Sequence, residues 1–414
     1  MKASAEDSST GWPPESQAQR LSGRGGAAVA RSIQTLGNAL LRAVARCLWP
    51  RRRPLTAARV CIYRIGNIGD MVCALPALHA IRRAYPAAHL TLLTSPGASG
   101  APWAGELLAT LGWLDEISVY HSNDVAGWRN WWRMVQRLRA RRFDVWIELP
   151  TVLALFRTLI RNAMVARLAG ARWGGGWRLA TVRIAVRAQS AWLAFDDEVD
   201  RLLKILAALG IDAGDAAFPL TLPDHYRDRA DELLGPLTPA NRRLIAIAPG
   251  AKRATNRWPA ERFVEVGRQL VGHGFGLVMV GGAAERELCS TVASALGTGN
   301  ALNLAGRCSL PESCAVLARC ALLICNDSGA QHLAAAMGTP CLSLFAARDF
   351  GLRWRPHGPQ HLVIRKWVPC HTCLLEVCPY DNRCIGLIAV DEVTNAAQRL
   401  LNSSPELGPA ENSI

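Results

Sequence analysis

The sequence lacks any long uninterrupted run of apolar residues. A helix that crosses a membrane needs about 18 or more consecutive apolar residues, and no segment of this chain reaches that length. The first residues also lack the basic start and prompt apolar core of a secretory signal. We therefore expect a cytoplasmic protein that would touch a membrane only by its surface and from the inner face.

Motifs of several other protein classes are also missing. The sequence contains no zinc finger and no aromatic RNA-binding signature, although its formal net charge of +14 calls for a negatively charged partner. A phosphorylated substrate or an anionic membrane surface remains, and no nucleic-acid partner is expected. No serine–histidine–aspartate arrangement or zinc-hydrolase motif indicates hydrolysis.

The composition is that of a globular protein without a disulfide scaffold. Half of the 414 residues are hydrophobic and 19% are charged. Because this length exceeds what one core usually supports, we expect two domains. Most of the 13 cysteines are scattered through apolar segments, where a reduced thiol packs as a small hydrophobic group.

The strongest functional signal is the segment 326–340, NDSGAQHLAAAMGTP. It follows the apolar run 321–325 and predicts a strand that turns sharply into a helix of small residues. The first amides of a helix lack intrahelical partners and carry the positive end of the helix dipole. Asp327, Ser328 and Gly329 are therefore placed where a phosphate or a ribose could be held.

The same pattern occurs near the start of the folded region. The apolar run 60–65 leads through Gly66, Asn67 and Gly69 to Asp70, in the first turn of a predicted helix. Taken alone, Asp70 could be no more than an N-terminal helix cap. Two strand–turn–helix units far apart in the sequence instead indicate two nucleotide-fold halves.

Four ordered segments resemble glycosyltransferase family 9, the bacterial lipopolysaccharide heptosyltransferases. They are RIGNIGDMVCALPALHAIRRAYP (64–86), IAIAPGAKRATNRWPAERF (245–263), GFGLVMVGGAAERE (274–287) and the segment 302–340. The resemblance covers about residues 58–393. It implies an α/β fold of GT-B type, in which two Rossmann-like domains with parallel sheets face a central cleft.

This resemblance implies inverting transfer of L-glycero-D-manno-heptose from ADP-heptose to a hydroxyl of the lipopolysaccharide inner core, an anionic lipid-linked saccharide. Asp70 matches the family's amino-terminal aspartate and is the candidate general base, with Gly66, Asn67 and Gly69 on the acceptor side. Positive groups and helix amides would support the leaving diphosphate, and no cofactor is required. The donor-binding candidates are Gly250, Lys252, Arg257, Glu285, Asp327, Ser328, Gly329 and His332.

One position departs from the family pattern. The family usually has a lysine two positions before the tryptophan of its Trp-Pro pair, and this chain has Asn256 there. A neutral amide cannot replace that charge. Arg257 or Lys252 could hold the diphosphate instead, or Arg257 could simply be solvated and Lys252 too distant. Glu285 could reach the nucleotide, or it could be an exposed residue at a helix start.

Two basic segments are candidates for a membrane or acceptor face. Residues 27–53 combine arginines with an apolar stripe at helical spacing, which fits a helix in a lipid headgroup layer and equally a helix docked on its own protein. Residues 129–142 contain six arginines, of which Arg133 and Arg137 are acceptor-side candidates. The stripe of the first segment consists of Val29, Ile33, Leu36, Leu40, Val44 and Cys47.

Cys370, Cys373, Cys378 and Cys384 form a cluster within one short segment. In a reducing cytoplasm, four neighbouring thiols favour a structural zinc ion or an iron–sulfur cluster over two disulfides. The spacing is not that of a standard zinc finger, and a catalytic metal is not expected.

We predict five segments along the chain. These are a disordered tail with a basic amphipathic helix (1–57), an acceptor-side domain (58–222), a linker (223–243), a nucleotide-sugar domain (244–390), and a closing helix with a tail (391–414). In GT-B enzymes such a helix packs back toward the first domain. Two alternatives stay open: another nucleotide-sugar enzyme of this architecture, such as an epimerase or a transferase with a different donor, and a non-catalytic protein at the membrane face.

Overall fold

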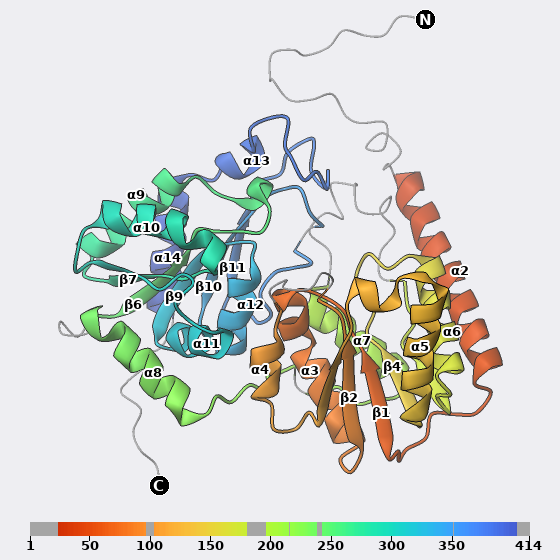
Figure 1. Ribbon diagram of the computed structural model, residues 1–414. Coiled ribbons are helices and arrows are strands. Elements are labelled where there is room, and N and C mark those ends of the chain that lie inside the picture. The colour runs from red at the N-terminus through yellow and green to blue at the C-terminus, as the bar shows by residue number, and fades with distance from the viewer. Residues whose placement is uncertain are drawn as a thin grey trace, which may run out of the picture.

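The structure is a computed structural model that describes residues 24–96, 103–179, 196–214, 216–237, 242–350 and 352–403, with the side chains of 24–31 left out. The tails predicted before residue 24 and after residue 403 lie outside these ranges. The described chain forms two α/β domains, each built on a parallel sheet (Figure 1). This is the GT-B type of fold that the resemblance implied.

The first domain contains a five-stranded sheet in the order β3-β2-β1-β4-β5, and all neighbouring strands are parallel. The middle strand, β1, pairs with β2 and β4. It is buried on both faces, as the apolar run 60–65 predicts. The strands are β1 (Arg59–Tyr63), β2 (His89–Thr94), β3 (Glu116–Val119), β4 (Val145–Glu148) and β5 (Trp173–Gly175).

Helices cover both faces of this sheet. The face that carries Val60 and Ile62 packs on α3 (Ile68–Ala84), α4 (Gly105–Ala109) and α7 (Glu198–Ala208). The face that carries Cys61 and Trp146 packs on α2 (Arg24–Leu48), α5 (Gly127–Ala140) and α6 (Phe156–Leu168). A short 3-10 helix, η1 (Ser122–Val125), precedes α5.

The second domain contains a six-stranded parallel sheet in the order β11-β10-β9-β6-β7-β8. Its two central strands, β6 and β9, are completely buried, which explains why the runs 244–248 and 320–326 are nearly free of polar residues. The strands are β6 (Leu244–Ala248), β7 (Gly276–Met279), β8 (Ala301–Asn303), β9 (Cys320–Asn326), β10 (Cys341–Phe345) and β11 (Leu362–Arg365).

One face of the second sheet packs on α9, α10 and α14, and the other packs on α8, α11 and α12. The helices are α8 (Asp224–Leu234), α9 (Ala260–Gly272), α10 (Arg286–Leu296), α11 (Leu310–Ala318), α12 (Gly329–Ala336), α13 (Arg383–Gly386) and α14 (Val390–Ser403). Three 3-10 helices complete the domain: η3 (Gly235–Leu237), η4 (Ala254–Asn256) and η5 (Ala283–Glu285).

Two segments differ from the expected organisation. The segment 223–243, expected as a linker, contains α8, whose apolar residues pack on α11 of the second domain. The closing helix α14 packs on α9 and on β9, β10 and β11 of the second domain rather than back toward the first. The reason is that its apolar face, with Val393, Ala396 and Leu401, completes the core of the second sheet.

Candidate active site

The two strand–turn–helix motifs meet at the junction of the domains. Helix α3 follows the carboxyl end of β1, helix α12 follows that of β9, and the two helices pack on each other. A Cβ atom added to Gly69 would lie 2.7 Å from Cδ2 of His332 and 3.7 Å from Cα of Gly329. Glycine at position 69 therefore allows the amino-terminal turns of the two helices to approach closely, as ligand sites at the carboxyl ends of parallel strands require.

Asp70 lies in the first turn of α3 and remains partly open. Its Oδ2 accepts a hydrogen bond of 3.0 Å from the backbone N–H of Asn67, and its Oδ1 lies 3.5 Å from Nη2 of Arg64. The side chain is 17% exposed. Burial raises the pKa of Asp70, although Arg64 opposes this shift. A carboxylate with a raised pKa is a better proton acceptor, so this geometry suits a general base.

A buried ion network lies behind Asp70. Arg64 is completely buried and donates to Oε1 of Glu198 at 2.9 Å and to the carbonyl oxygen of Pro150 at 3.0 Å. Arg201, one turn further along α7, donates to both carboxylate oxygens of Glu198 at 2.6 and 2.7 Å. Two arginines on one glutamate leave net positive charge beside Asp70, and this charge opposes the rise of its pKa that burial causes.

Sequence reasoning missed this network. Arg64 could have been recognised as a candidate, because it is the first residue of the motif RIGNIGD. Nothing in the local sequence indicates a role for Glu198 or Arg201. Their spacing of three residues on α7 is that of an ordinary surface helix pair. Only the fold reveals that this turn of α7 is buried beneath Asp70.

In the donor block, Asp327 is held by two side-chain amides. Its Oδ1 accepts from Nε2 of Gln331 at 3.0 Å, and its Oδ2 accepts from Nδ2 of Asn256 at 3.3 Å. Asn256, at the position where the family usually has a lysine, therefore faces Asp327 and donates a hydrogen bond to it. Burial raises the pKa of Asp327 to about 7, and the negative charge of Asp349 adds to the shift.

Three polar atoms near the start of α12 are buried without a hydrogen-bond partner among the described residues. They are Oγ of Ser328, Oδ1 of Asn256 and Oε1 of Gln331. Buried polar atoms are nearly always paired in native proteins. Together with the free amides of the first turn of α12, they form a site that a polar ligand would complete.

The remaining donor candidates surround this site at different distances. Nζ of Lys252 reaches across the junction to Oδ1 of Asn67, 3.3 Å away. Gly250 lies against Glu285, because a Cβ on the glycine would be 2.1 Å from Oε1 of the glutamate. Oε2 of Glu285 accepts from the backbone N–H of Gly282 at 2.8 Å and so caps η5. Arg257 is exposed, and its Nε donates to the carbonyl oxygen of Ala251 at 2.9 Å.

His332 contacts the first domain directly. Its Nδ1 lies 3.2 Å from Sγ of Cys73, a residue 259 positions away in the sequence. Burial lowers the pKa of His332 to about 4, so the imidazole is neutral near pH 7. In this structure His332 is therefore a neutral side chain that joins α12 to α3.

Two acceptor-side candidates are not brought to this site. Arg133 and Arg137 are exposed on α5, which covers the face of the first sheet opposite to α3. Gly66 does lie at the site, since a Cβ there would be 2.3 Å from Cβ of Asp70.

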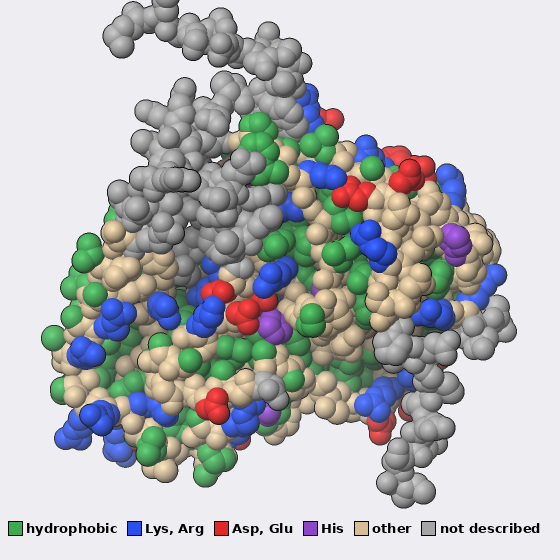
Figure 2. Space-filling view, turned by 180° about the vertical axis from the view of Figure 1, so that it is seen from behind, with side chains coloured by type: hydrophobic (Ala, Val, Ile, Leu, Met, Phe, Trp, Pro, Cys, Tyr) green, Lys and Arg blue, Asp and Glu red, His purple; other side chains and the backbone are tan. Residues whose placement is uncertain are grey.

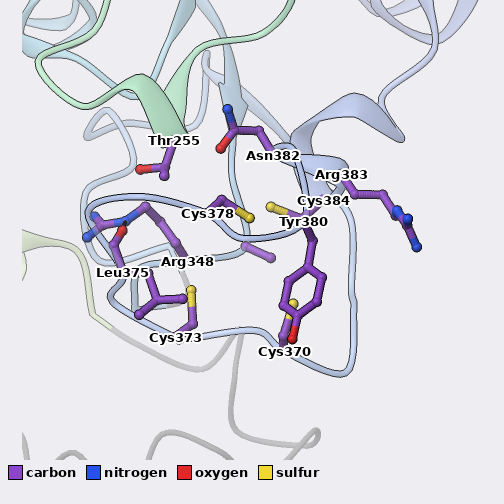
Figure 3. Close-up of a pocket in the computed structure, with 11 residues that line it drawn as sticks. Thr255, Arg348, Cys370, Cys373, Leu375, Cys378, Tyr380, Asn382, Arg383 and Cys384 are labelled. Atoms are coloured by element: carbon purple, nitrogen blue, oxygen red, sulfur yellow. Dashed lines mark hydrogen bonds between the residues drawn. The ribbon is translucent and has the colours of Figure 1, made fainter. Parts of the chain in front are cut away.

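The four clustered cysteines line one cavity in the segment after β11, where all four are free thiols (Figure 3). Burial raises the pKa of Cys370 to about 11, and the other three thiols add to the shift. Among the described residues, the one set of three metal-type ligand atoms within 4.8 Å of one another is formed by Asp197, Asp200 and His357. The four sulfurs therefore share a cavity but are spread more widely around it.

Two parallel-sheet domains with a base candidate and a helix-dipole site at their junction fit the class of two-domain nucleotide-sugar enzymes. The model of glycosyltransferase family 9 (heptosyltransferase) matches residues 131–383. This chain therefore belongs to glycosyltransferase family 9, which confirms the resemblance, and it is a glycosyltransferase.

Individual relatives agree with this assignment. The chain is 26% identical over 297 residues to lipopolysaccharide heptosyltransferase 2 of Escherichia coli (strain K12), covering 67% of this chain and 80% of that protein. The structure of E. coli ADP-heptose lps heptosyltransferase II superposes with a TM-score of 0.60 at 21% identity, covering 83% and 98% of the two chains. The iron-containing dodecameric glycosyltransferase TibC of enterotoxigenic E. coli H10407 superposes with a TM-score of 0.50 at 13% identity, covering 85% and 78%.

Proposed function

We propose that this protein transfers heptose from ADP-heptose to a hydroxyl of the lipopolysaccharide inner core, with inversion at the sugar carbon. The observation that carries this proposal is the meeting of Asp70 with the amino-terminal turn of α12 at one domain junction. The names of the heptosyltransferase relatives support the donor and the acceptor class. We also propose that the reaction takes place at the inner face of the membrane that holds the acceptor.

In the proposed reaction, Asp70 accepts the proton of the acceptor hydroxyl while the hydroxyl oxygen bonds to the anomeric carbon of the heptose. The bond between that carbon and the diphosphate oxygen breaks, and ADP leaves with the electron pair. Negative charge then grows on the diphosphate, where the amides of the α12 amino terminus and the ammonium of Lys252 can stabilise it. No covalent intermediate is needed for a single inversion.

Lys252 is the residue that we propose compensates for Asn256. Its ammonium already lies between the domains, 3.3 Å from Asn67 of the acceptor-side loop. Arg257 is less suitable because its guanidinium is engaged with the backbone of its own loop. A lysine that reaches across the junction can contact a diphosphate bound at α12 by rotating about its side-chain bonds.

The function is tested by incubating the purified chain with ADP-heptose, with and without a deacylated inner-core acceptor. We expect ADP release that depends on the acceptor, together with an acceptor mass gain of one heptose. Conversion of the donor without an acceptor would instead indicate an epimerase or a hydrolase. Donor binding without any turnover would favour a different acceptor or a non-catalytic role, and a lack of donor binding would rule out ADP-heptose.

The substitution Asn256→Lys should restore a charge beside Asp327 and tighten ADP binding. In the native chain the folded pKa of Asp327 is about 7, above its ordinary value of 3.8. Between these two pKa values the folded state therefore keeps a proton on Asp327 that the unfolded state has lost. The free energy of unfolding consequently falls as pH rises from 3.8 to about 7. The lysine should lower the pKa of Asp327 and flatten that fall, which chemical unfolding at pH 4 to 8 would measure.

A matched Asn256→Gln variant controls for side-chain size. His332 changes stability in the opposite direction, because its pKa of about 4 lies below its ordinary value of 6.5 and its contribution is lost on acidification. All three proteins share His332, so the difference between their pH profiles isolates Asp327. Identical profiles for the lysine and glutamine variants would contradict the assigned contact.

We also propose that Cys370, Cys373, Cys378 and Cys384 hold a structural zinc ion or an iron centre. Their thiols fit such a group chemically, and the iron-containing TibC shares the fold. The ligands would cross-link the segment after β11, whose turns place Thr372, Leu374, Asp381 and Asn382 in the left-handed region. The metal would stabilise this segment and take no part in transfer.

Elemental analysis of the purified native chain should find about one equivalent of zinc, or iron with an iron–sulfur absorbance. Cys378→Ser should lose the metal and melt at a lower temperature. Cys289→Ser, at a buried cysteine outside the cluster, is the matched control and should retain the metal. A native chain that is free of metal after anaerobic purification would overturn this assignment.

A further inference from the structure

Three helices on one face of the first sheet contain no acidic residue. The helices α2, α5 and α6 together contain eleven arginines and neither aspartate nor glutamate. Nine of these arginines lie in the part of the chain with described side chains, and all nine are exposed. None of the nine forms a salt bridge with a described residue. They are Arg42, Arg46, Arg129, Arg133, Arg137, Arg139, Arg157, Arg161 and Arg167.

Helix α2 docks on the domain through a face other than its apolar stripe. Gly37 lies against Leu179, Asn38 exchanges hydrogen bonds with the backbone of Leu179, and Leu41 is buried. The stripe that the sequence suggested for lipid or protein contact points outward instead. Ile33, Leu36 and Leu40 are 48%, 69% and 53% exposed. The segment was expected either to lie on lipid or to dock on its own protein, and the structure shows the helix docked. Ile33, Leu36 and Leu40 of its apolar stripe nevertheless stay exposed.

The exposed apolar surface continues from α2 onto the neighbouring helices. Eight of the fourteen large hydrophobic side chains that are exposed among the described residues belong to α2, α5, α6 or the turn before α6. Besides the three on α2, they are Trp128, Trp132, Leu153, Leu155 and Met164. Along the left edge of Figure 2, where these helices come into view, green and blue side chains mix and no red ones appear. We call these eight residues and the nine arginines the basic–apolar face.

This face reaches the edge of the sheet at which Asp70 lies. The amino-terminal half of α2 bonds to Leu179, which follows β5, whereas Trp49 beyond its other end bonds to Ala171, which precedes β5. Trp128 and Leu155 lie at the starts of α5 and α6, which follow the carboxyl ends of β3 and β4. Because all five strands are parallel, these apolar side chains lie toward the carboxyl edge of the sheet, as Asp70 does.

We propose that the basic–apolar face binds the surface of an anionic phospholipid bilayer. Exposed leucines and tryptophans enter the headgroup and upper acyl region, while surrounding arginines pair with lipid phosphates, which is the pattern of interfacial helices. Within the described residues no helix is both long and apolar enough to cross a bilayer, so the contact is peripheral. Bound this way, the carboxyl edge of the first sheet lies next to the membrane, where a lipid-linked acceptor would present its sugar.

The test is flotation of the full chain with vesicles of phosphatidylglycerol and phosphatidylcholine. We expect binding that rises with the anionic fraction and weakens at high salt. The triple variant Ile33→Glu, Leu36→Glu, Leu40→Glu should weaken binding by at least about tenfold, because three apolar contacts are lost and three repulsive charges are added. The exposed Leu387 of the second domain supplies the control, Leu387→Glu, which should bind like the native chain.

Light scattering and activity separate the remaining outcomes. A native dimer that the triple variant converts to a monomer would make this face a contact between copies and overturn the membrane assignment. Equal flotation of native and triple-variant chains would also overturn it. Flotation does not depend on catalysis, so the assignment can stand if heptosyl transfer is not found. If transfer is found, the triple variant should keep its rate on the deacylated acceptor and lose it on vesicle-embedded acceptor.

Discussion

Asp70→Asn should reduce kcat for heptosyl transfer by roughly 10²- to 10⁴-fold, the usual contribution of a general base. The amide oxygen can still accept the hydrogen bond from the backbone N–H of Asn67, so the start of α3 should keep its shape. ADP binding should be unchanged because the donor block lies on the other domain. The measurements are steady-state kinetics with the deacylated acceptor and calorimetric titration with ADP.

The chain offers a matched control in Asp124. Its Oδ2 accepts from the backbone N–H of His121, three positions earlier, which is the same local geometry as that of Asp70 and Asn67. Asp124 caps a 3-10 helix away from α3 and α12, so Asp124→Asn should leave turnover unchanged. Residual activity of Asp70→Asn within tenfold of native would show that Asp70 is a helix cap only.

The pH dependence of turnover by the native enzyme independently tests the raised pKa of Asp70. Burial raises its pKa above the ordinary value of 3.8, so the base becomes protonated at a higher pH than an exposed aspartate would. Turnover should therefore fall on acidification before a typical carboxylate titrates. An acid limb at or below the ordinary aspartate value would argue against this environment.

The strands and the two ligand-facing turns were predictable because their information is local. A buried parallel strand needs a nearly continuous apolar run, and the runs before Gly66 and before Asp327 meet this need. Small residues then allow the close approach of α3 and α12, as Gly69 illustrates. The resemblance to the family added the order of these blocks, which local patterns do not contain.

Contacts between distant segments were not predictable in the same way. The apolar stripe of α2 fitted contact with lipid and contact with the protein equally well, and the helix docks instead through Gly37, Asn38 and Leu41. Gly37 lies against Leu179, and Asn38 exchanges two hydrogen bonds with the backbone of Leu179. Helix α14 likewise has an apolar face whose partner cannot be read from its own sequence. The partner of an amphipathic helix depends on which surface the rest of the chain leaves uncovered.

The buried ion network beneath Asp70 was likewise not predictable from the local sequence. Arg64, Glu198 and Arg201 are ordinary surface residue types, and only burial turns them into a coupled network. Once they are buried, each charge depends on the others, because an unpaired ion in a dry interior carries a large desolvation cost. This dependence makes Glu198 a position where loss of the charge should have a large effect on stability.

Glu198→Gln should lower the free energy of unfolding by about 3–5 kcal/mol, because it leaves the buried Arg201 with no carboxylate partner among the described residues and leaves Arg64 with only the longer contact to Asp70. Glu198 is 1% exposed, and Arg64 and Arg201 are 0% and 8% exposed. Although burial alone would raise the pKa of Glu198, Arg201 and Arg64 hold it below the ordinary value of 4.5. This stabilisation is therefore present above pH 4.5 and lost as pH falls toward the depressed folded pKa, so the native chain should approach the variant in acid.

The matched control is Glu232→Gln, which breaks the exposed pair with Arg229 and should change stability by less than about 1 kcal/mol. A second measurement distinguishes an effect of Glu198 on Asp70 from an effect on stability alone. The negative charge of Glu198 contributes to the raised pKa of Asp70, so Glu198→Gln should shift the acid limb of the kcat profile to lower pH in the protein that remains folded. A destabilised variant with an unmoved limb would restrict Glu198 to the core, whereas a shifted limb would show that α7 tunes the base on α3.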